Sequence, residues 1–194
     1  TLQINLQGTK NLLDICTQYK NISMTMASSA EVYGESEGEH TELSPLNPQS
    51  PYAASKVAAE SLCVAYHHTY STNVRVVRNF NTFGIRQKSS GYGSVIAIFV
   101  RRALDGKPLI VYGTGEQTRD YQYIEDAVNG YVVAETIPSG EIINTGVGED
   151  YTINNIAKMV VEIAGSDSSI VHMDPRPGEV MKLRSNVDKI NGYG

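Results

Sequence analysis

The sequence predicts an α/β fold in which helices flank a largely parallel sheet. Short apolar runs typical of buried strands alternate along the chain with longer stretches whose apolar residues recur at helical spacing. Glycine, proline and polar residues separate these segments. One longer polar stretch, from Ser28 to Ser50, interrupts the alternation, and loops of that length within a compact domain usually carry function.

The first half of the chain predicts two helices and two strands. Apolar residues at roughly helical spacing predict a helix over residues 1–20, and a short alternating run predicts a strand over residues 22–27. A second helix is expected over residues 51–70, because Ser50 suits its N-cap and Pro51 its first turn. A buried strand then ends near Arg78.

The second half continues the alternation. We expect a helix over residues 95–104 that Gly106 ends, a strand within "PLIVYG", and a strand that leads into a helix near Ile124. A strand in "GEIINTGVG" and a helix capped by Thr152 follow, and the tail holds one or two short strands and the start of a helix. The Gly/Ser-rich stretch at residues 88–94 marks the predicted border of a smaller second lobe.

Composition limits the classes of partner. A chain of 194 residues with 41% hydrophobic residues can bury a core, and its net charge of -5 argues against nucleic acid or an anionic membrane as main partner. No apolar run is long enough to span a bilayer, so we expect a soluble, cytoplasmic protein. Cys16 and Cys63 lie in apolar runs and predict buried, reduced thiols. The four histidines are not spaced as metal ligands, so no metal site is expected.

Tyr52 and Lys56 are candidate catalytic residues because they stand four positions apart on a predicted helix. That spacing puts their β-carbons about 5–6 Å apart on one face. An adjacent ammonium favours the phenolate, so we expect Lys56 to lower the pKa of Tyr52 from about 10. Such a phenol can take a proton from a substrate hydroxyl and return it. The same spacing also fits an amphipathic helix that carries one aromatic residue and one solvated lysine.

A serine pair, Ser28 and Ser29, ends the first predicted strand. Open α/β sheets bind their ligands at the carboxyl ends of the strands. A serine there can hydrogen-bond to a substrate hydroxyl and orient it. The alternative is a polar strand end followed by a turn.

Six segments, taken in order, resemble the extended short-chain dehydrogenase/reductase family, and more narrowly its NAD-dependent nucleotide-sugar epimerases and dehydratases. They are "NLQGTKNLL", "SSAEVYG", "YAASK", "RNFNTFGIR", "YGTGEQTRDYQYIEDA" and "RPGE". The resemblance runs along nearly the whole chain; Tyr-x-x-x-Lys alone is weak, whereas six ordered motifs are specific. It implies a Rossmann-like parallel sheet, of which the chain holds only the carboxyl-terminal part, with a smaller α/β substrate-binding lobe.

The resemblance also implies roles for individual residues. Ser29, Tyr52 and Lys56 would be catalytic and contact NAD, and Asn5 and Phe80 would touch the same dinucleotide. The substrate would be a nucleoside-diphosphate sugar, bound by Asn81, Ser94, Val95, Tyr112, Arg119 and Arg176.

Within that set, Tyr112 would lie near the base, and Arg119 and Arg176 would hold the diphosphate. Guanidinium forks bind such groups bidentately, independently of any resemblance. The alternative for each arginine is an ordinary surface residue paired with Asp120 or Glu179.

The reaction type rests on two positions after the serine. The 4,6-dehydratases of this family usually show an Asp-Glu pair there, whereas this chain has Ala30 and Glu31. Alanine cannot donate the proton that expels water, so we favour epimerisation at carbon 4 through a 4-keto intermediate, as in UDP-glucose 4-epimerases. The alternatives are a 4,6-dehydratase, a UDP-glucuronate decarboxylase, or a non-catalytic partial chain that only binds nucleotide-sugar.

By the same resemblance, residues 1–88 would be part of a dinucleotide-binding domain. Residues 89–194 would be mainly a nucleotide-sugar lobe, with residues 120–147 returning to the first sheet. The family's G-x-x-G-x-x-G turn is absent from the sequence, so we expect an internal piece of a longer enzyme that does not retain NAD alone. Family members usually pair through helices like residues 2–19 and 52–70, which predicts a homodimer.

Overall fold

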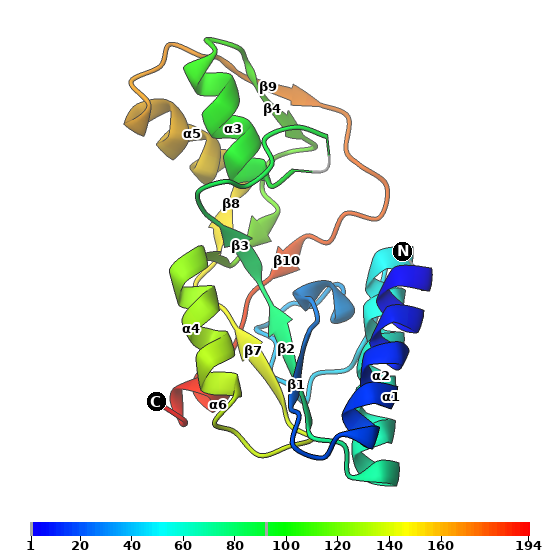
Figure 1. Cartoon of the computed structure of the whole chain (residues 1–194). Helices are drawn as coiled ribbons and strands as arrows, with labels where there is room; N and C mark the ends of the chain where they lie inside the picture. Colours follow the sequence, from blue (N-terminus) through cyan, green and yellow to red (C-terminus); the bar gives the residue numbers. More distant parts are fainter. Residues whose placement is uncertain (1, 92) are drawn as a thin grey trace.

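The computed structural model describes residues 2–91 and 93–194. Thr1, where the first helix was predicted to start, lies outside these ranges, as does Tyr92. The described chain forms a lower lobe and an upper lobe, with short strands between them (Figure 1). Strands and helices alternate throughout, which confirms the predicted α/β class.

A three-stranded parallel sheet forms the centre of the lower lobe. Its strands are β1 (Met24–Ala27), β2 (Val74–Asn79) and β7 (Ile142–Thr145), in the order β1-β2-β7. The central strand β2 is buried from Val74 to Arg78, as expected for a parallel strand covered on both faces.

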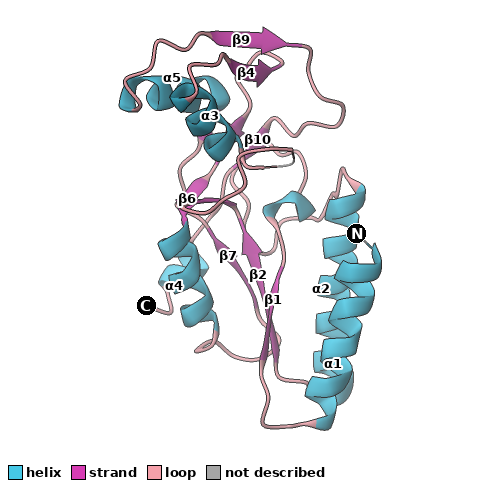
Figure 2. Cartoon of the chain, turned by 45° about the horizontal axis from the view of Figure 1, so that its top comes forward, coloured by secondary structure: helices cyan, strands magenta, loops and turns pink. Residues whose placement is uncertain are grey.

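Helices cover both faces of this sheet. One face packs on α1 (Gly8–Gln18) and α2 (Pro51–Tyr70), and the other on α4 (Ile124–Ala134), as Figures 1 and 2 show. A π-helical turn, η1 (Gln3–Gln7), precedes α1, and a short helix, α6 (Asp188–Asn191), packs near β7.

The helix α2 has the bounds that the sequence predicted. The Oγ of Ser50 accepts a hydrogen bond of 3.0 Å from the backbone N–H of Ala53, and Pro51 occupies the first turn. The buried face of the helix carries small residues such as Ala53, Ser55 and Ala59, so its backbone can approach the sheet closely. The carboxyl end of β1 and the start of α2 are thereby held together.

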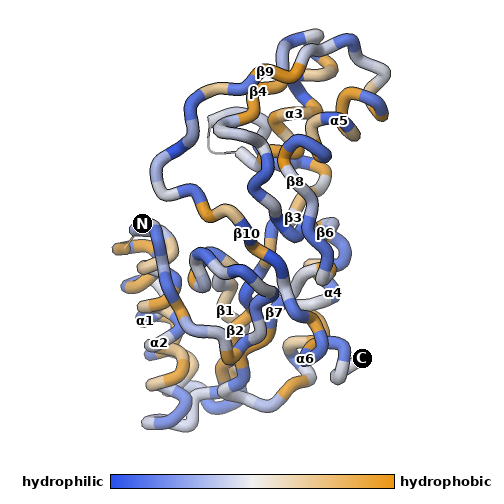
Figure 3. Tube along the Cα trace, turned by 180° about the vertical axis from the view of Figure 1, so that it is seen from behind, coloured by the Kyte–Doolittle hydropathy of each residue, from blue (hydrophilic) through white to orange (hydrophobic). Residues whose placement is uncertain are grey.

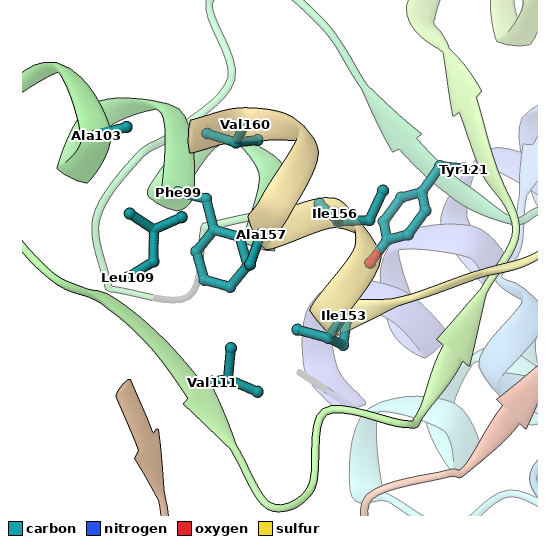
Figure 4. Packing of buried hydrophobic residues seen from close by; sticks show 9 residues of the cluster. All are labelled: Phe99, Ala103, Leu109, Val111, Tyr121, Ile153, Ile156, Ala157 and Val160. Carbon is teal, nitrogen blue, oxygen red and sulfur yellow. The ribbon is translucent and has the colours of Figure 1, made fainter. Parts of the chain in front are cut away.

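The upper lobe is a second, smaller α/β unit. A parallel pair of strands, β4 (Leu109–Tyr112) and β9 (Ile170–Met173), packs against α3 (Val95–Leu104) and α5 (Ile153–Ile163). Figure 4 shows the shared core. Its buried members are Phe99, Ala103, Leu109, Val111, Tyr121, Ile153, Ile156, Ala157 and Val160. Thr152 caps α5, as predicted, by accepting a 3.0 Å hydrogen bond from the N–H of Asn155.

Among the described residues, five short strands lie between the two lobes. They are β3 (Asn81–Phe83), β5 (Thr118–Arg119), β6 (Tyr121–Tyr123), β8 (Tyr151–Thr152) and β10 (Lys182–Leu183). β3 pairs with β6, and β5 lies between β8 and β10.

The fully buried carboxylate of Asp120 connects the segments that run between the two lobes. It accepts hydrogen bonds from the N–H groups of Val147 (2.9 Å) and Gly148 (3.0 Å) and from the hydroxyl of Ser185. Because these partners come from distant parts of the chain, Asp120 holds the region between the lobes together.

Some apolar residues lie on the surface of the outer helices, whereas the two cysteines are buried. Figure 3 shows apolar positions on the outer helices as well as inside. Leu12 and Ile15 on α1 are about half exposed. Cys16 and Cys63 are free and buried, as predicted. Within the described part of the chain, no helix combines the length and apolar character needed to cross a membrane.

Candidate active site

The candidate site lies beyond the carboxyl ends of β1 and β2, where the lower lobe faces the upper one. Two adjoining cavities of about 260 Å³ and 950 Å³ open there, and we call them together the cleft. Most of the predicted site residues line the cleft, namely Ser29, Tyr52, Phe80, Asn81, Ser94, Val95, Tyr112, Arg119 and Arg176. Lys56 and Asn5 are not among the lining residues.

Strand β1 and helix α2 position the three predicted catalytic residues. Ser29 is the second residue after β1 and accepts a 3.3 Å hydrogen bond from the N–H of Glu31, which caps a short 3₁₀ turn, η2 (Ala30–Val32). Tyr52 lies in the first turn of α2 and is 40% exposed. The Nζ of Lys56 lies 5.8 Å from the centroid of the Tyr52 ring.

The expected effect of Lys56 on Tyr52 is wrong for this structure. Burial raises the pKa of Tyr52 above its ordinary value of 10.0, and the charge of Glu31 raises it further. The hydroxyl of Ser29 acts in the opposite direction by favouring the phenolate, but burial dominates. The ammonium of Lys56 donates a 2.7 Å hydrogen bond to the carbonyl oxygen of Ala27 rather than to the phenol oxygen.

Burial also affects Lys56 itself. It lowers the pKa of the ammonium below 10.5, and the nearby carboxylate of Glu60 opposes that shift. Lys56 lies near the carbonyl oxygen of Ala27 and the carboxylate of Glu60, and its hydrogen bond to Ala27 stabilises the carboxyl end of β1 close to Ser29. Its position one turn after Tyr52 still leaves the ammonium close to the phenol.

Asn5 and Phe80, the two further residues predicted to touch the dinucleotide, make structural contacts. The Nδ2 of Asn5 donates a 2.9 Å hydrogen bond to the Oγ of Ser55 and so joins η1 to α2. Phe80 is 3% exposed and packs with residues that include Val32 and Tyr33 while still lining the smaller cavity. The structure therefore brings Phe80, but not Asn5, to the edge of the cleft.

Two guanidinium groups face the cleft from its upper side. Arg119, on β5, donates a 2.8 Å hydrogen bond to the carbonyl oxygen of Thr118. The Cζ of Arg176 lies 3.9 Å from the centroid of the Tyr112 ring. Neither arginine forms an ion pair within residues 2–91 and 93–194, so the alternative pairing with Asp120 or Glu179 is not found there.

The amino-terminal end of α3 forms part of the cleft wall. Ser94 is the residue before the helix and Val95 its first residue, and both are partly buried in the wall of the larger cavity. Free N–H groups and the helix dipole at such an end favour negative charge. The upper side of the cleft thus offers two cations and one helix end to an anionic ligand.

The cleft is also lined by residues that were not predicted as members of the site, and four of them carry polar groups that bear on its chemistry. Glu31 and Glu179 line both cavities and place carboxylates near the arginines. Gln87 and Tyr121 line the larger cavity, and the Oε1 of Gln87 and the hydroxyl of Tyr121 are buried without a hydrogen-bond partner in the described part of the chain. The positions of these four residues in the sequence could have indicated them, because each lies within or next to a stretch that carries predicted site residues.

A buried polar network supports the cleft from below. The Nη2 of Arg78 lies 2.7 Å from a carboxylate oxygen of Glu60, and both side chains are 3% exposed. Glu60 also accepts a hydrogen bond from the hydroxyl of Ser28. Arg78 donates to the hydroxyl of Tyr33 (3.0 Å), which donates to Asn144 Oδ1 (2.6 Å). The network ties the residue before Ser29 to α2, β2 and β7.

Comparison with known proteins agrees with the resemblance in the sequence. Residues 1–146 match the model of the NAD dependent epimerase/dehydratase family. UDP-glucuronic acid decarboxylase 1 of Xenopus tropicalis is 33% identical over an alignment of 195 residues, which covers 97% of this chain and 46% of the decarboxylase. Other relatives at 32% and 33% identity are named UDP-glucuronate 4-epimerase and dTDP-glucose 4,6-dehydratase.

Solved structures show the same likeness in three dimensions. Pal from Bacillus thuringiensis matches with a TM-score of 0.94 and 39% identity, over 100% of this chain and 62% of Pal. The UDP-glucose 4-epimerase of Thermus thermophilus, solved in complex with NAD, matches with a TM-score of 0.92 and 33% identity. That match covers 99% of this chain and 64% of the epimerase.

The chain therefore spans about half to two thirds of the length of these proteins. The predicted family and its Rossmann-like α/β fold are both confirmed. The sequence match, the shared fold and the residues gathered in the cleft lead to one conclusion: the chain belongs to the NAD-dependent epimerase/dehydratase family.

Proposed function

We propose that the cleft binds a nucleoside-diphosphate sugar, with Arg119 and Arg176 on the diphosphate. The observation that carries this proposal is the presence of both guanidinium groups in the same cleft as Ser29 and Tyr52. Arginine forks bind phosphate oxygens bidentately, and the end of α3 favours the same charge. Relatives solved with UDP-glucose and with UDP-glucuronic acid support the choice of ligand.

NAD is the cofactor that we propose for the enzyme. Ser29, Tyr52 and Lys56 fit its nicotinamide end, because they lie at the carboxyl end of β1, where open parallel sheets bind nucleotides. No G-x-x-G-x-x-G turn occurs among the 194 residues to cradle the two phosphates, so the fit concerns that end alone. When bound, NAD supplies the acceptance and return of hydride.

The proposed reaction is epimerisation at carbon 4 of the sugar. Ser29 would hold the 4-hydroxyl, and Tyr52 would take its proton at the phenol oxygen as carbon 4 is oxidised to a ketone. Tyr52 would return that proton to the keto oxygen when the ketone is reduced on its opposite face, which inverts the centre. The two arginines keep the diphosphate anchored while the sugar turns, and the larger cavity of about 950 Å³ leaves room for that motion.

The state of Tyr52 suits one half of this cycle better than the other. Burial keeps the phenol protonated, which is the form that donates to a keto oxygen. Proton removal needs the phenolate, and Lys56 favours it when its ammonium turns from the Ala27 carbonyl to the phenol. We therefore propose that Lys56 exchanges between these two acceptors during the cycle.

Glu31 favours a second reaction on the same scaffold. Its carboxylate is exposed, lines both cavities and raises the pKa of Tyr52 through its charge. A carboxylate beside the oxidised sugar can act as a base in a dehydratase or decarboxylase. The side chain of Ala30, however, cannot donate a proton to leaving water, which is why we place epimerisation first. A chain that only binds nucleotide-sugar is the third candidate.

Product analysis separates these functions. The protein is incubated with excess NAD and with UDP-glucose, UDP-N-acetylglucosamine and UDP-glucuronate, and the products are identified by NMR. Epimerisation predicts the 4-epimer of one of these sugars and no loss of mass. A 4-keto-6-deoxy product or released carbon dioxide would overturn the epimerase assignment, and binding without any product would favour the third candidate.

We also propose that the chain forms a homodimer through the outer faces of α1 and α2. Leu12, Ile15, Tyr19 and Tyr70 expose apolar surface there, from 47% to 57% of each side chain. Apolar helix faces of this kind bury readily against a second copy. Light scattering at micromolar concentration is expected to give twice the chain mass of 21.2 kDa, and a monomer would contradict the proposal.

A further inference from the structure

Two residues predicted to bind different parts of one ligand contact each other. The Cζ of Arg176 lies 3.9 Å from the centroid of the Tyr112 ring, within the range of a cation–π contact. Both residues line the larger cavity. Tyr112 was expected near a nucleotide base and Arg176 on a diphosphate. Their contact indicates a different role for Tyr112, one that is tied to Arg176.

The backbone around the pair explains why they meet. Tyr112 ends β4 and stands opposite Met173, the last residue of the parallel strand β9. The N–H of Gly113 donates a 2.8 Å hydrogen bond to the carbonyl oxygen of Met173. Arg176 follows three residues later, so the paired strands deliver the arginine to the tyrosine at the same edge.

A buried amide ties the loop of Arg176 to Tyr112 a second time. Gln117 is 3% exposed, and its Nε2 donates hydrogen bonds to the carbonyl oxygen of Tyr112 (2.9 Å) and to Glu179 Oε1 (3.1 Å). Arg176 lies between these two anchored positions along the chain, with the β4–β9 pairing before it and the Gln117 contact to Glu179 after it. The stack is therefore fixed from both ends of the loop.

We propose that Tyr112 is a positioning residue for Arg176. The ring face holds the guanidinium in the cleft before ligand arrives, which reduces the rotamer freedom that the arginine loses on binding. The face of the ring that Arg176 covers is not available to a stacked base. This inference rests on the proposed function, because it assumes that Arg176 contacts a diphosphate.

The test measures binding of UDP to the full 194-residue chain by calorimetry. Tyr112→Leu removes the ring, Tyr112→Phe keeps it, and Arg176→Gln removes the charge. We expect Tyr112→Leu to weaken UDP binding about three- to tenfold, as the loss of one cation–π contact implies. Tyr112→Phe should keep the affinity for UDP within about twofold of the parent chain, because the ring face makes the contact with Arg176.

Non-additivity is the decisive readout. In the Arg176→Gln background, Tyr112→Leu should cause no further loss, because the ring then has no guanidinium to hold. Tyr193→Leu is the matched control, because Tyr193 is a partly exposed tyrosine outside the cleft, and it should leave UDP affinity unchanged. Melting temperatures of all variants check that the chain still folds.

The outcomes separate this inference from the proposed function. If the losses of Tyr112→Leu and Arg176→Gln add, Tyr112 contacts UDP directly and the positioning role is overturned, while the diphosphate assignment stands. If Arg176→Gln leaves UDP affinity unchanged, or if the parent chain does not bind UDP, the diphosphate assignment fails and the positioning role falls with it.

Discussion

The Nζ of Lys56 donates a 2.7 Å hydrogen bond to the carbonyl oxygen of Ala27, the last residue of β1. The same ammonium lies 5.8 Å from the centroid of the Tyr52 ring. Lys56 thus joins α2 to the strand end that leads into Ser29, and it does so with the group that was expected to act on Tyr52. This arrangement leaves burial as the main influence on the phenol.

The first prediction concerns the titration of Tyr52. Burial disfavours the phenolate, so the pKa of Tyr52 in the ligand-free chain should lie above its ordinary value of 10.0. NMR of the chain labelled with ¹³C at the tyrosine ζ carbons measures it, and Tyr52→Phe assigns the resonance. A titration midpoint clearly below 10 would show that Lys56 or Ser29 outweighs burial.

The second prediction concerns the buried pair of Glu60 and Arg78. Glu60→Gln removes one charge and leaves the guanidinium without its counter-ion in a site that is 3% exposed, so it should lower the free energy of unfolding by about 3–5 kcal/mol. Urea unfolding measures the change. The matched control is Arg101→Gln, which breaks the exposed pair with Asp105 and should cost less than about 1 kcal/mol. Equal costs for both variants would contradict this account.

The third prediction concerns pH and His40. The ring of His40 stacks on Tyr33 with 4.5 Å between centroids, and its buried Nε2 has no hydrogen-bond partner in the described part of the chain. Burial lowers the pKa of His40 below 6.5, and the charge of Glu35 only partly opposes that shift. Arg78, a member of the neighbouring buried polar network, places its charged guanidinium group over the same Tyr33 ring.

The sign of the effect follows from the lowered pKa. At pH values between 6.5 and the lowered pKa of His40 in the folded chain, the unfolded chain binds more protons than the folded chain does. The free energy of unfolding should therefore fall as pH drops through that window. His40→Phe keeps a ring on Tyr33 but cannot titrate, so it should flatten this part of the curve of unfolding free energy against pH. An unchanged slope in His40→Phe would show that other groups cause the acid sensitivity.

The fourth prediction concerns the cofactor. The sequence has no glycine-rich turn to hold the two phosphates of NAD, so the chain alone should not retain the dinucleotide. Acid release from the purified chain, followed by absorbance and mass measurements, detects any bound NAD, and calorimetry measures fresh binding. Stoichiometric NAD or micromolar affinity would overturn the prediction.

Local signals explain which parts of the fold could be predicted. The bounds of α2 and α3 follow from residues within or beside each helix, such as Ser50, Pro51 and Gly106. The first helix was predicted less well, because nothing local showed that Gln3–Gln7 would take a π-helical turn before α1.

Long-range contacts explain what the sequence could not show. Tyr33 and Asn144 hydrogen-bond across 111 positions, and Glu60 pairs with Arg78 from another element. Similarly, motif resemblance could nominate Tyr112, Arg176 and Lys56, but not their partners. Which acceptor an ammonium faces, or which ring a guanidinium covers, depends on packing that exists only in the folded chain.

The central claim is that Tyr52 transfers the proton while Arg119 and Arg176 hold the diphosphate. Tyr52→Phe and Arg119→Gln are therefore compared in the presence of excess NAD, with turnover and UDP affinity measured on the same samples. Tyr52→Phe should lower kcat by about 10²–10⁴-fold, the usual contribution of general acid–base catalysis, and leave the Kd for UDP within about twofold. Arg119→Gln should weaken UDP binding by about tenfold or more, as expected for a charge-assisted hydrogen bond. A Tyr52→Phe variant that loses turnover and UDP binding to the same extent would contradict the account and make Tyr52 a structural residue.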